Sequence, residues 1–166
     1  MAVFRPTRYV RSVDSIDVDD LCDEGIRCVL VDRDNTLVPR DTKVAPPEVR
    51  AWLRDLRSVG ISVCMVSNNF HTKAVCASAR DLGCEVVHHA MKPAPIAVHV
   101  ALGHMGVTKE EAILVGDQLF TDVMAGNLAG VTTVLVRPQS QEDLWYTKIL
   151  RKVERLFLKN VRYEGE

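Results

Sequence analysis

The sequence predicts an α/β fold: a three-layer, Rossmann-like domain with a parallel sheet between two layers of helices. Short apolar segments alternate with helical patterns of about 10–15 residues, and this alternation is typical of βαβ units. The segment 61–67 is apolar without interruption, as expected for a strand that helices cover on both faces. The length of 166 residues suits one domain, and 47% hydrophobic with 26% charged residues is an ordinary globular composition.

The first predicted unit begins with a strand at 27–32, where R-C-V-L-V-D is mostly apolar. The Pro-Pro pair at 46–47 begins a helix, because proline fits the first helical turn. Apolar residues at positions 49, 52, 53 and 56 share one face of that helix, and Gly60 ends it. The strand at 61–67 follows directly, so this unit is strand, helix, strand.

The next elements are a helix at 71–82, which Gly83 ends, and a short strand at 85–88. A further helix is predicted at 95–104. The tetrapeptide T-K-E-E at 108–111 has the pattern of a capping box, which pairs a threonine with a glutamate three positions later.

The sheet is completed by strands at 112–116 and 132–137, with a helix at 121–129 between them. Because helices connect the strands, the strands are expected to run parallel. The whole chain, 1–166, is interpreted as one domain, with a basic N-terminal arm at 1–20 and a final helix at 142–160.

That final helix is amphipathic and basic. Two interpretations stay open: a helix that packs on the core with a solvated basic face, or an element that lies on an anionic membrane surface. Nucleic acid is not expected as a partner, because aromatic residues are only 5% and no stacking platform is visible. The apolar stripe is Tyr146, Ile149, Leu150, Val153, Leu156, Phe157 and Val161, and the basic residues are Lys148, Arg151, Lys152, Arg155, Lys159 and Arg162.

The formal net charge of −1 is unevenly distributed. Residues 1–13 carry three arginines and no acid, and residues 148–166 carry six basic residues against three acids. The segment between them has an excess of acids. Two basic ends on an acidic body favour an anionic surface or polymer as partner, with two solvated ends as the alternative.

The chain has no apolar run near the roughly 20 residues that a membrane span needs, and no secretory signal at its start. We therefore expect a cytoplasmic protein, with peripheral contact at the inner face of the membrane as an option. The five cysteines form no C-x-x-C pair, so buried reduced thiols are favoured over disulfides or zinc.

Polar residues gather directly after the predicted strands. In parallel sheets the carboxyl ends of the strands meet at one edge, where ligands bind. Each group alone could be a turn or a helix cap, but together they predict a site with four carboxylates and one lysine. The groups are Asp32-Arg33-Asp34-Asn35-Thr36, Ser67-Asn68-Asn69, Lys92-Pro93, Gly116-Asp117-Gln118 and Thr121-Asp122.

The predicted cluster of oxygen ligands suits Mg²⁺, which prefers carboxylates and phosphate oxygens. A dication together with Lys92 would neutralise most of the charge of Asp32, Asp34, Asp117 and Asp122. Crowded carboxylates also favour retention of a proton on one of them. These residues therefore indicate a cation-assisted phosphoryl site with one ionised nucleophile and one protonatable neighbour.

The order V-D-R-D-N-T, a serine after the second strand, K-P, and G-D-Q-x-x-T-D resembles the four motifs of the haloacid dehalogenase superfamily, in its phosphatase branch. The resemblance covers 27–137. More narrowly, R-Y-V-R-S-V near the start and the tail resemble subclass IIIA phosphatases of the YqeG type. That family is similar to the mitochondrial phosphatidylglycerophosphate phosphatase.

The resemblance implies roles for the matching positions. Asp32 would be the nucleophile, and Asp34 the acid that protonates the leaving oxygen and later activates water. Substrate contacts would come from Thr36, Ser67, Asn68 and Lys92, with Ser67 and Lys92 also catalytic. The metal set would be Asp32, Asp117, Asp122 and Asp34, the last through its main-chain carbonyl.

The spacing leaves no room for a cap domain. Thr36 and Ser67 are 31 positions apart, and Ser67 and Lys92 are 25 apart, and both intervals are used by predicted elements. The site is therefore expected to be open, and a large substrate or a second subunit, as in a homo-oligomer, would have to close it.

The function that these features predict is an Mg²⁺-dependent phosphomonoesterase that forms an aspartyl-phosphate and acts on a bulky substrate. By resemblance, that substrate is phosphatidylglycerophosphate. The alternatives are a phosphatase of a soluble sugar or nucleotide phosphate or of a phosphoprotein, and a catalytically idle interaction module. A phospho-receiver domain is excluded by order, because its phosphorylated Asp follows the third strand, whereas here D-x-D follows the first.

Overall fold

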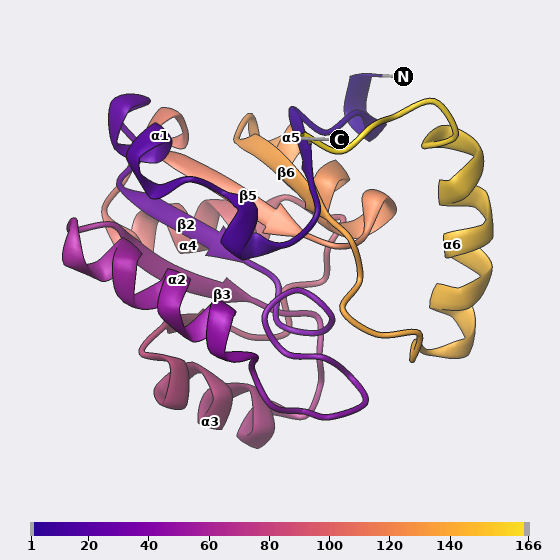
Figure 1. The fold of residues 1–166 in the computed structure, drawn as a ribbon, viewed down its shortest axis with the longest axis horizontal. Helices are drawn as coiled ribbons and strands as arrows, with labels where there is room; N and C mark the ends of the chain where they lie inside the picture. Colours follow the sequence, from indigo (N-terminus) through magenta and orange to yellow (C-terminus); the bar gives the residue numbers. More distant parts are fainter. Residues whose placement is uncertain (1, 165–166) are drawn as a thin grey trace.

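The computed structural model describes residues 2–164, and Glu166, which contributes to the charge of the tail, lies outside them. Its centre is a six-stranded, fully parallel sheet (Figure 1). The strand order across the sheet is β1-β6-β5-β2-β3-β4. The strands are β1 (Arg8–Val10), β2 (Cys28–Val31), β3 (Ser62–Val66), β4 (Glu85–Val87), β5 (Ala112–Gly116) and β6 (Thr132–Val136).

The central strands are buried on both faces, which explains their uninterrupted apolar sequence. Every residue of β2 and of β5 is buried. Val29 of β2 lies in register with Val63 of β3 on one side and with Ile113 of β5 on the other. Burial on both faces thus fixes these three strands at the centre of the sheet.

Helices cover the two faces of the sheet and make it a three-layer fold. On one face, α2 (Pro47–Ser58) and α3 (Thr72–Leu82) pack on the sheet, and α1 (Val18–Asp23) lies against α2. On the other face lie α4 (Ile96–Met105) and α5 (Met124–Ala129). The predicted fold class is confirmed. Within residues 2–164, one of these helices lies in each connection between successive strands, and no cap domain is inserted.

The first 20 residues, interpreted from the sequence as a basic N-terminal arm, contribute a strand to the sheet. Residues 8–10 form β1, which pairs with β6 at the sheet edge. The pattern was missed because a three-residue strand is too short to show a periodicity. The basic side chain of Arg8 pairs with Glu164 at 2.9 Å, which ties the two ends of the chain together (Figure 1).

The final helix, α6 (Trp145–Phe157), stands apart from the two helical layers, beyond the carboxyl ends of the strands (Figure 1). Its buried residues are Thr147 and Glu154, whereas Ile149 and Leu156 are exposed. The interpretation as a core-packing helix with a solvated basic face is therefore wrong, because the polar side of the helix packs inward. No helix within residues 2–164 is long and apolar enough to span a bilayer.

Candidate active site

The carboxyl edge of the sheet brings together the side chains that the sequence placed after the strands. Asp32 follows β2, Ser67 follows β3 and Asp117 follows β5, and all three are buried. Lys92 lies five residues beyond β4 and is 5% exposed. The parallel arrangement puts all these strand ends on one side, so the predicted convergence is present.

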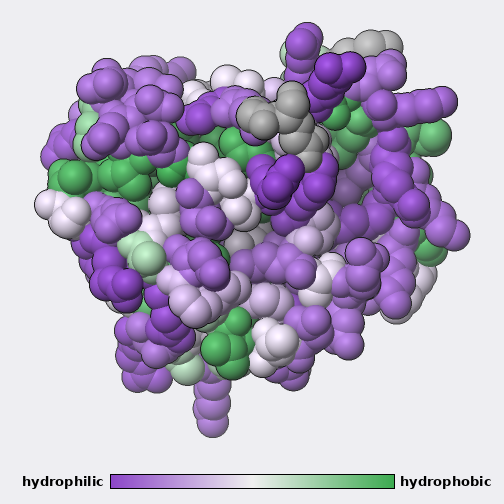
Figure 2. Space-filling view, viewed as in Figure 1, coloured by the Kyte–Doolittle hydropathy of each residue, from purple (hydrophilic) through white to green (hydrophobic). Residues whose placement is uncertain are grey.

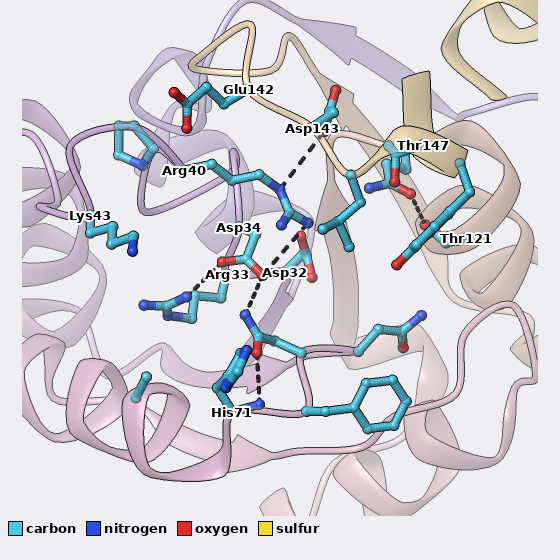
Figure 3. Close-up of a pocket in the computed structure, with 18 residues that line it drawn as sticks. Asp32, Arg33, Asp34, Arg40, Lys43, His71, Thr121, Glu142, Asp143 and Thr147 are labelled. Carbon is cyan, nitrogen blue, oxygen red and sulfur yellow. Dashed lines mark hydrogen bonds and ion pairs between the residues drawn. The ribbon is translucent and has the colours of Figure 1, made fainter. Parts of the chain in front are cut away.

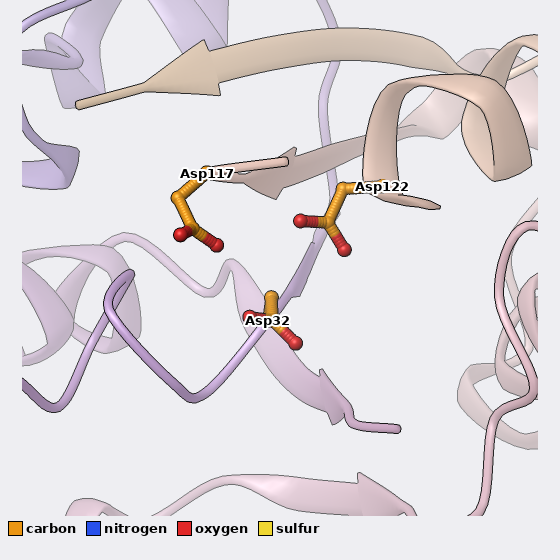
Figure 4. A group of neighbouring side chains, drawn as sticks. All are labelled: Asp32, Asp117 and Asp122. Carbon is orange, nitrogen blue, oxygen red and sulfur yellow. The ribbon is translucent and has the colours of Figure 1, made fainter. Parts of the chain in front are cut away.

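Three carboxylates form the centre of this cluster (Figure 4). One oxygen from each of Asp32, Asp117 and Asp122 can be chosen so that all lie within 4.8 Å of one another. Asp122 comes from a π-helical turn, Leu119–Val123, and its Oδ2 accepts a hydrogen bond from the Gln118 amide at 3.1 Å. The turn folds this carboxylate back onto the end of β5.

The place of Asp122 requires a glycine at position 116. A Cβ atom on Gly116 would lie 2.2 Å from Cγ of Asp122, closer than such atoms approach each other. The glycine of the G-D-Q segment therefore leaves the volume in which the third carboxylate lies.

Lys92 links two of the three carboxylates. Its Nζ donates to Asp32 Oδ1 at 2.8 Å and to Asp122 Oδ1 at 2.5 Å. Burial disfavours the ammonium, but the Asp122 and Asp32 carboxylates outweigh burial and raise the pKa of Lys92 above its usual value. The side chain therefore stays cationic and offsets part of the negative charge.

Burial has the opposite effect on the acids. Desolvation raises the pKa of Asp32 well above its usual value, against the attraction of Lys92. Desolvation also raises the pKa of Asp117 to about 7, although Arg151 opposes the shift. Crowded carboxylates of this kind are stabilised by added positive charge, so the all-oxygen set fits a divalent cation.

Asp34 lies two residues beyond Asp32 but has different partners (Figure 3). Its Oδ1 accepts from Arg33 at 2.6 Å and its Oδ2 accepts from Asn69 Nδ2 at 3.0 Å, with Arg40 3.8 Å from Oδ2. The side chain of Asp34 is not part of the carboxylate triad. This leaves the main-chain carbonyl as the group of Asp34 that the resemblance assigns to the metal.

Two of the residues expected to contact substrate have other partners in the structure. Thr36 is 1% exposed and donates its hydroxyl to Asp117 Oδ1 at 3.2 Å. The Asn68 side chain donates from Nδ2 to the main-chain carbonyl of Lys92 at 2.9 Å, and its Oδ1 accepts from the main-chain N–H of Lys92 at 2.8 Å. These contacts position Asp117 and Lys92. Ser67 is buried, and its Oγ accepts from the Asn69 amide at 3.1 Å.

Arg151 is the site residue that sequence reasoning missed. The sequence places it among the basic residues of the last helix, off the apolar stripe. In the structure its guanidinium bonds the Asp117 carboxylate and, at 2.6 Å, the Asp117 carbonyl. Its Nε donates to Asp143 Oδ2 at 2.9 Å. Burial alone would lower the pKa of Arg151, but the Asp117 and Asp143 carboxylates together outweigh burial and raise it. Arg151 and Arg33 add positive charge that the sequence-based charge balance did not include.

Glu154 fastens the same helix to the site. Its Oε1 accepts from the main-chain amides of Leu119 at 2.8 Å and Phe120 at 3.3 Å, at the start of the turn that carries Asp122. Helix α6 therefore borders one side of the site, a contact that the sequence analysis did not predict. The only signal in the sequence was a single acid, Glu154, among the basic residues of α6.

A cavity of about 580 Å³ opens above Asp32 and Asp34 (Figure 3). Basic side chains line one part of it, and apolar side chains line its margin. His71 also lines it. The basic residues are Arg33, Arg40 and Lys43, and the apolar ones are Phe70, Leu144 and Tyr146.

A parallel sheet that joins carboxylates, a lysine and a serine at its carboxyl edge is typical of phosphoryl-transfer enzymes. The family model of haloacid dehalogenase-like hydrolases matches residues 8–130. The chain therefore belongs to this family, in its phosphatase branch, and the predicted resemblance is confirmed.

Two curated relatives match nearly the whole chain. The probable phosphatase YqeG of Bacillus subtilis is 34% identical over 98% of this chain and 94% of its own length. The chloroplastic and mitochondrial phosphatidylglycerophosphate phosphatase 1 of Arabidopsis thaliana is 32% identical over 96% of this chain, which spans about half, 49%, of that relative.

Solved structures show the same fold at low sequence identity. The cobalt-bound deoxy-D-mannose-octulosonate 8-phosphate phosphatase of Haemophilus influenzae matches with a TM-score of 0.53 and 16% identity. The match covers 82% of this chain and 89% of that one. This likeness supports the three-layer architecture without a cap domain.

Proposed function

We propose that this protein is an Mg²⁺-dependent phosphomonoesterase that forms an aspartyl-phosphate on Asp32 and acts on phosphatidylglycerophosphate. The observation that carries the proposal is the pairing of two acids at the floor of one cavity. Asp32 is held by Lys92 at 2.8 Å, and Asp34 is held apart from it by Arg33 and Asn69. Two carboxyl groups with different surroundings suit two different roles, nucleophile and acid.

In the first step, a carboxylate oxygen of Asp32 forms a bond to phosphorus while the bond from phosphorus to the alcohol oxygen breaks. Asp34 gives its proton to that oxygen, so the product alcohol leaves neutral. In the second step water attacks phosphorus, Asp34 takes a proton from the water, and the bond to Asp32 breaks. Inorganic phosphate is released, and Asp32 and Asp34 return to their starting states.

The other residues stabilise the transferring group. Lys92 places a positive charge beside Asp32, and the Ser67 hydroxyl is assigned to donate a hydrogen bond to a phosphoryl oxygen. Asp32, Asp117, Asp122 and the main-chain carbonyl of Asp34 would hold Mg²⁺, which supplies charge stabilisation for the phosphoryl oxygens. Thr36 and Asn68 position Asp117 and Lys92.

The cavity supports a phospholipid substrate with two phosphate groups. Phosphatidylglycerophosphate has a terminal phosphomonoester and, further in, a phosphodiester that joins the lipid. With the monoester at Asp32, Lys43 and Arg40 are the basic side chains available to the phosphodiester. Glu142 and Asp143 line the same cavity, and Arg40 lies 3.7 Å from Asp143, so the phosphodiester would compete with that carboxylate for Arg40. Phe70, Leu144 and Tyr146 are 77%, 45% and 49% exposed at the cavity margin, where the glycerol and acyl groups would pass.

The test is phosphate release from a panel of substrates by the purified chain. The panel holds phosphatidylglycerophosphate in mixed micelles, a sugar phosphate, a nucleoside monophosphate, a phosphopeptide and p-nitrophenyl phosphate. We expect the phospholipid to have the highest kcat/KM, and we expect activity to vanish with chelator and return with Mg²⁺. A higher kcat/KM for a soluble phosphate would overturn the assignment of the phospholipid as substrate. Inactivity on all five compounds with Mg²⁺ would overturn the proposal that the protein is a phosphatase.

A further inference from the structure

Helix α6 exposes its apolar side and buries its polar side. Thr147 and Glu154 are 2% and 5% exposed, whereas Trp145, Ile149 and Leu156 are 74%, 55% and 73% exposed. Burial of apolar side chains normally drives a helix onto a protein core. At the end of the helix the Phe157 ring packs against Phe4 and Phe120. Burial of Trp145, Ile149 and Leu156 does not contribute to the orientation of α6, so polar contacts must fix the rest of the helix.

The contacts of the inner side account for this orientation. Arg151 bonds Asp117 and Asp143, and Glu154 accepts two main-chain amides of the turn that carries Asp122. A rotation that buried Ile149 and Leu156 would break these bonds and leave Asp117 without its cationic partner on α6. The outward apolar strip is thus held in place by the site itself.

Basic residues border the outward strip along one side. Lys148, Lys152, Arg155 and Lys159 are all exposed and follow one another at helical spacing. The only acid of the Trp145–Phe157 sequence, Glu154, lies on the inner side. In the space-filling view this side of the molecule is largely hydrophilic, with hydrophobic side chains at its right-hand edge (Figure 2).

We propose that the outward side of α6 is a docking surface for an anionic lipid bilayer. A helix with tryptophan and aliphatic residues on one side and lysines and arginines beside them lies in the interface of such membranes. The apolar strip would enter the acyl boundary, and the basic border would meet the anionic headgroups.

The charge of this surface favours a bilayer over the other occupants. A second copy of the chain would bring another strip bordered by basic residues, with no exposed acid on α6 to pair with them. A nucleic acid would meet the basic border but would leave Ile149 and Leu156 without an apolar partner. A bilayer of anionic lipids offers both a negative surface and an apolar interior.

The docking surface is continuous with the margin of the active-site cavity. Leu144 and Tyr146 line that cavity and are exposed, and Trp145 between them begins α6. Three residues of the basic border, Lys148, Lys152 and Arg155, also line a second cavity of about 590 Å³. A docked bilayer would thus present its headgroups beside Asp32. The inferred delivery of a lipid substrate rests on the proposed function, but the binding itself does not.

The experiment is co-sedimentation of the full chain with vesicles. Vesicles of phosphatidylglycerol and phosphatidylcholine are compared with vesicles of phosphatidylcholine alone, in 0.1 M and 1 M salt. We expect binding to the anionic vesicles in 0.1 M salt, where the Debye length is about 10 Å, and at least about tenfold weaker binding at 1 M, where it is about 3 Å. Equal or no binding to both kinds of vesicle in 0.1 M salt would overturn the proposal.

Two double variants test the two parts of the surface. Ile149→Ser with Leu156→Ser removes apolar contact, and Lys148→Glu with Lys152→Glu reverses charge. Each double variant should lower the partition coefficient onto anionic vesicles at least about tenfold, because each basic residue at an anionic surface raises that coefficient about fivefold. The matched controls are Val100→Ser with Leu128→Ser, at exposed apolar positions elsewhere, and Arg54→Glu with Arg80→Glu, which should bind as wild type.

Two further measurements separate the outcomes. Circular dichroism and thermal unfolding must be unchanged in the variants, and hydrolysis of p-nitrophenyl phosphate reports the site alone. Vesicle binding without phosphatase activity would support the docking surface and overturn the proposed function. Phosphatase activity without vesicle binding would support the proposed function and overturn the docking surface. A dimer in light scattering that Ile149→Ser with Leu156→Ser converts to a monomer, without vesicle binding, would assign the surface to a second copy instead.

Discussion

Arg151 and Asp117 are 34 positions apart in the chain, yet the Arg151 guanidinium bonds both the carboxylate and the carbonyl of Asp117. The pair joins the last helix to the carboxylate triad. Because the guanidinium lies beside a proposed metal ligand, the attachment of α6 and the charge of the site are coupled.

The first prediction concerns this pair. Arg151→Gln removes a positive charge next to Asp117, so Mg²⁺ should bind about threefold to tenfold more tightly in calorimetry. The same change should loosen α6, with faster hydrogen exchange across Trp145–Phe157. Arg155→Gln, on the exposed side of the same helix, is the control and should change neither. Unaltered Mg²⁺ affinity and exchange in Arg151→Gln would show that the pair has no part in holding the helix.

The second prediction concerns the nucleophile. Asp32→Asn keeps the shape of the side chain but removes the attacking anion, so kcat should fall by about 10⁴ or more. Asp14→Asn makes the same change at an exposed position and should leave kcat as it is. Activity of Asp32→Asn within tenfold of wild type would remove Asp32 from this role.

The third prediction separates the acid from the nucleophile. Asp34→Asn should lower kcat on alkyl phosphates by about 10²–10⁴, because an alkoxide leaves poorly without a proton. Nitrophenolate leaves without help, so single-turnover formation of the phosphoenzyme from p-nitrophenyl phosphate should be much less affected. Equal losses in that first step for both substrates would contradict the assignment.

The fourth prediction uses the glycine beside the triad. Gly116→Ala places a Cβ 2.2 Å from Cγ of Asp122, so the carboxylate has to move and kcat/KM should fall about 100-fold. Gly103→Ala is the matched control, because no atom lies within 4 Å of its Cβ position in α4. The control should stabilise the protein by about 0.5–1 kcal/mol against thermal unfolding. A fully active Gly116→Ala would mean that Asp122 can shift without consequence.

The fifth prediction concerns the thiols. Burial raises the pKa of Cys84 to about 11 and the pKa of Cys64 to about 12, so both stay protonated at pH 8 and should react slowly with iodoacetamide. Their labelling should accelerate only as the pH approaches those values. Cys22 is exposed and should be labelled first, as peptide mass spectrometry would show.

Much of this site could be predicted because its acids directly follow apolar strands. Asp32 and Asp117 directly follow β2 and β5. Because the strands of the sheet run parallel, both residues must lie at its carboxyl edge. The same reasoning could not find β1, since three residues at an edge strand carry too little pattern.

Helix α6 shows where sequence patterns lead in the wrong direction. Its strong amphipathic pattern predicts that the apolar side packs inward, as in most helices. In the structure, the bonds of Arg151 and Glu154 to the site outweigh that tendency. A long-range ion pair of this kind leaves no periodic signal, and a single buried acid among basic residues is its only trace.

The pairing of β1 with β6 bears on how the chain folds as it is synthesised. Among the strands, residues 8–10 leave the ribosome before the others, but their partners at 134–136 emerge last. Residues 8–10 therefore have no strand partner until the other five strands have been made. The edge of β6 stays exposed for as long as β1 is not docked, which makes this closing step the part of folding most open to wrong partners.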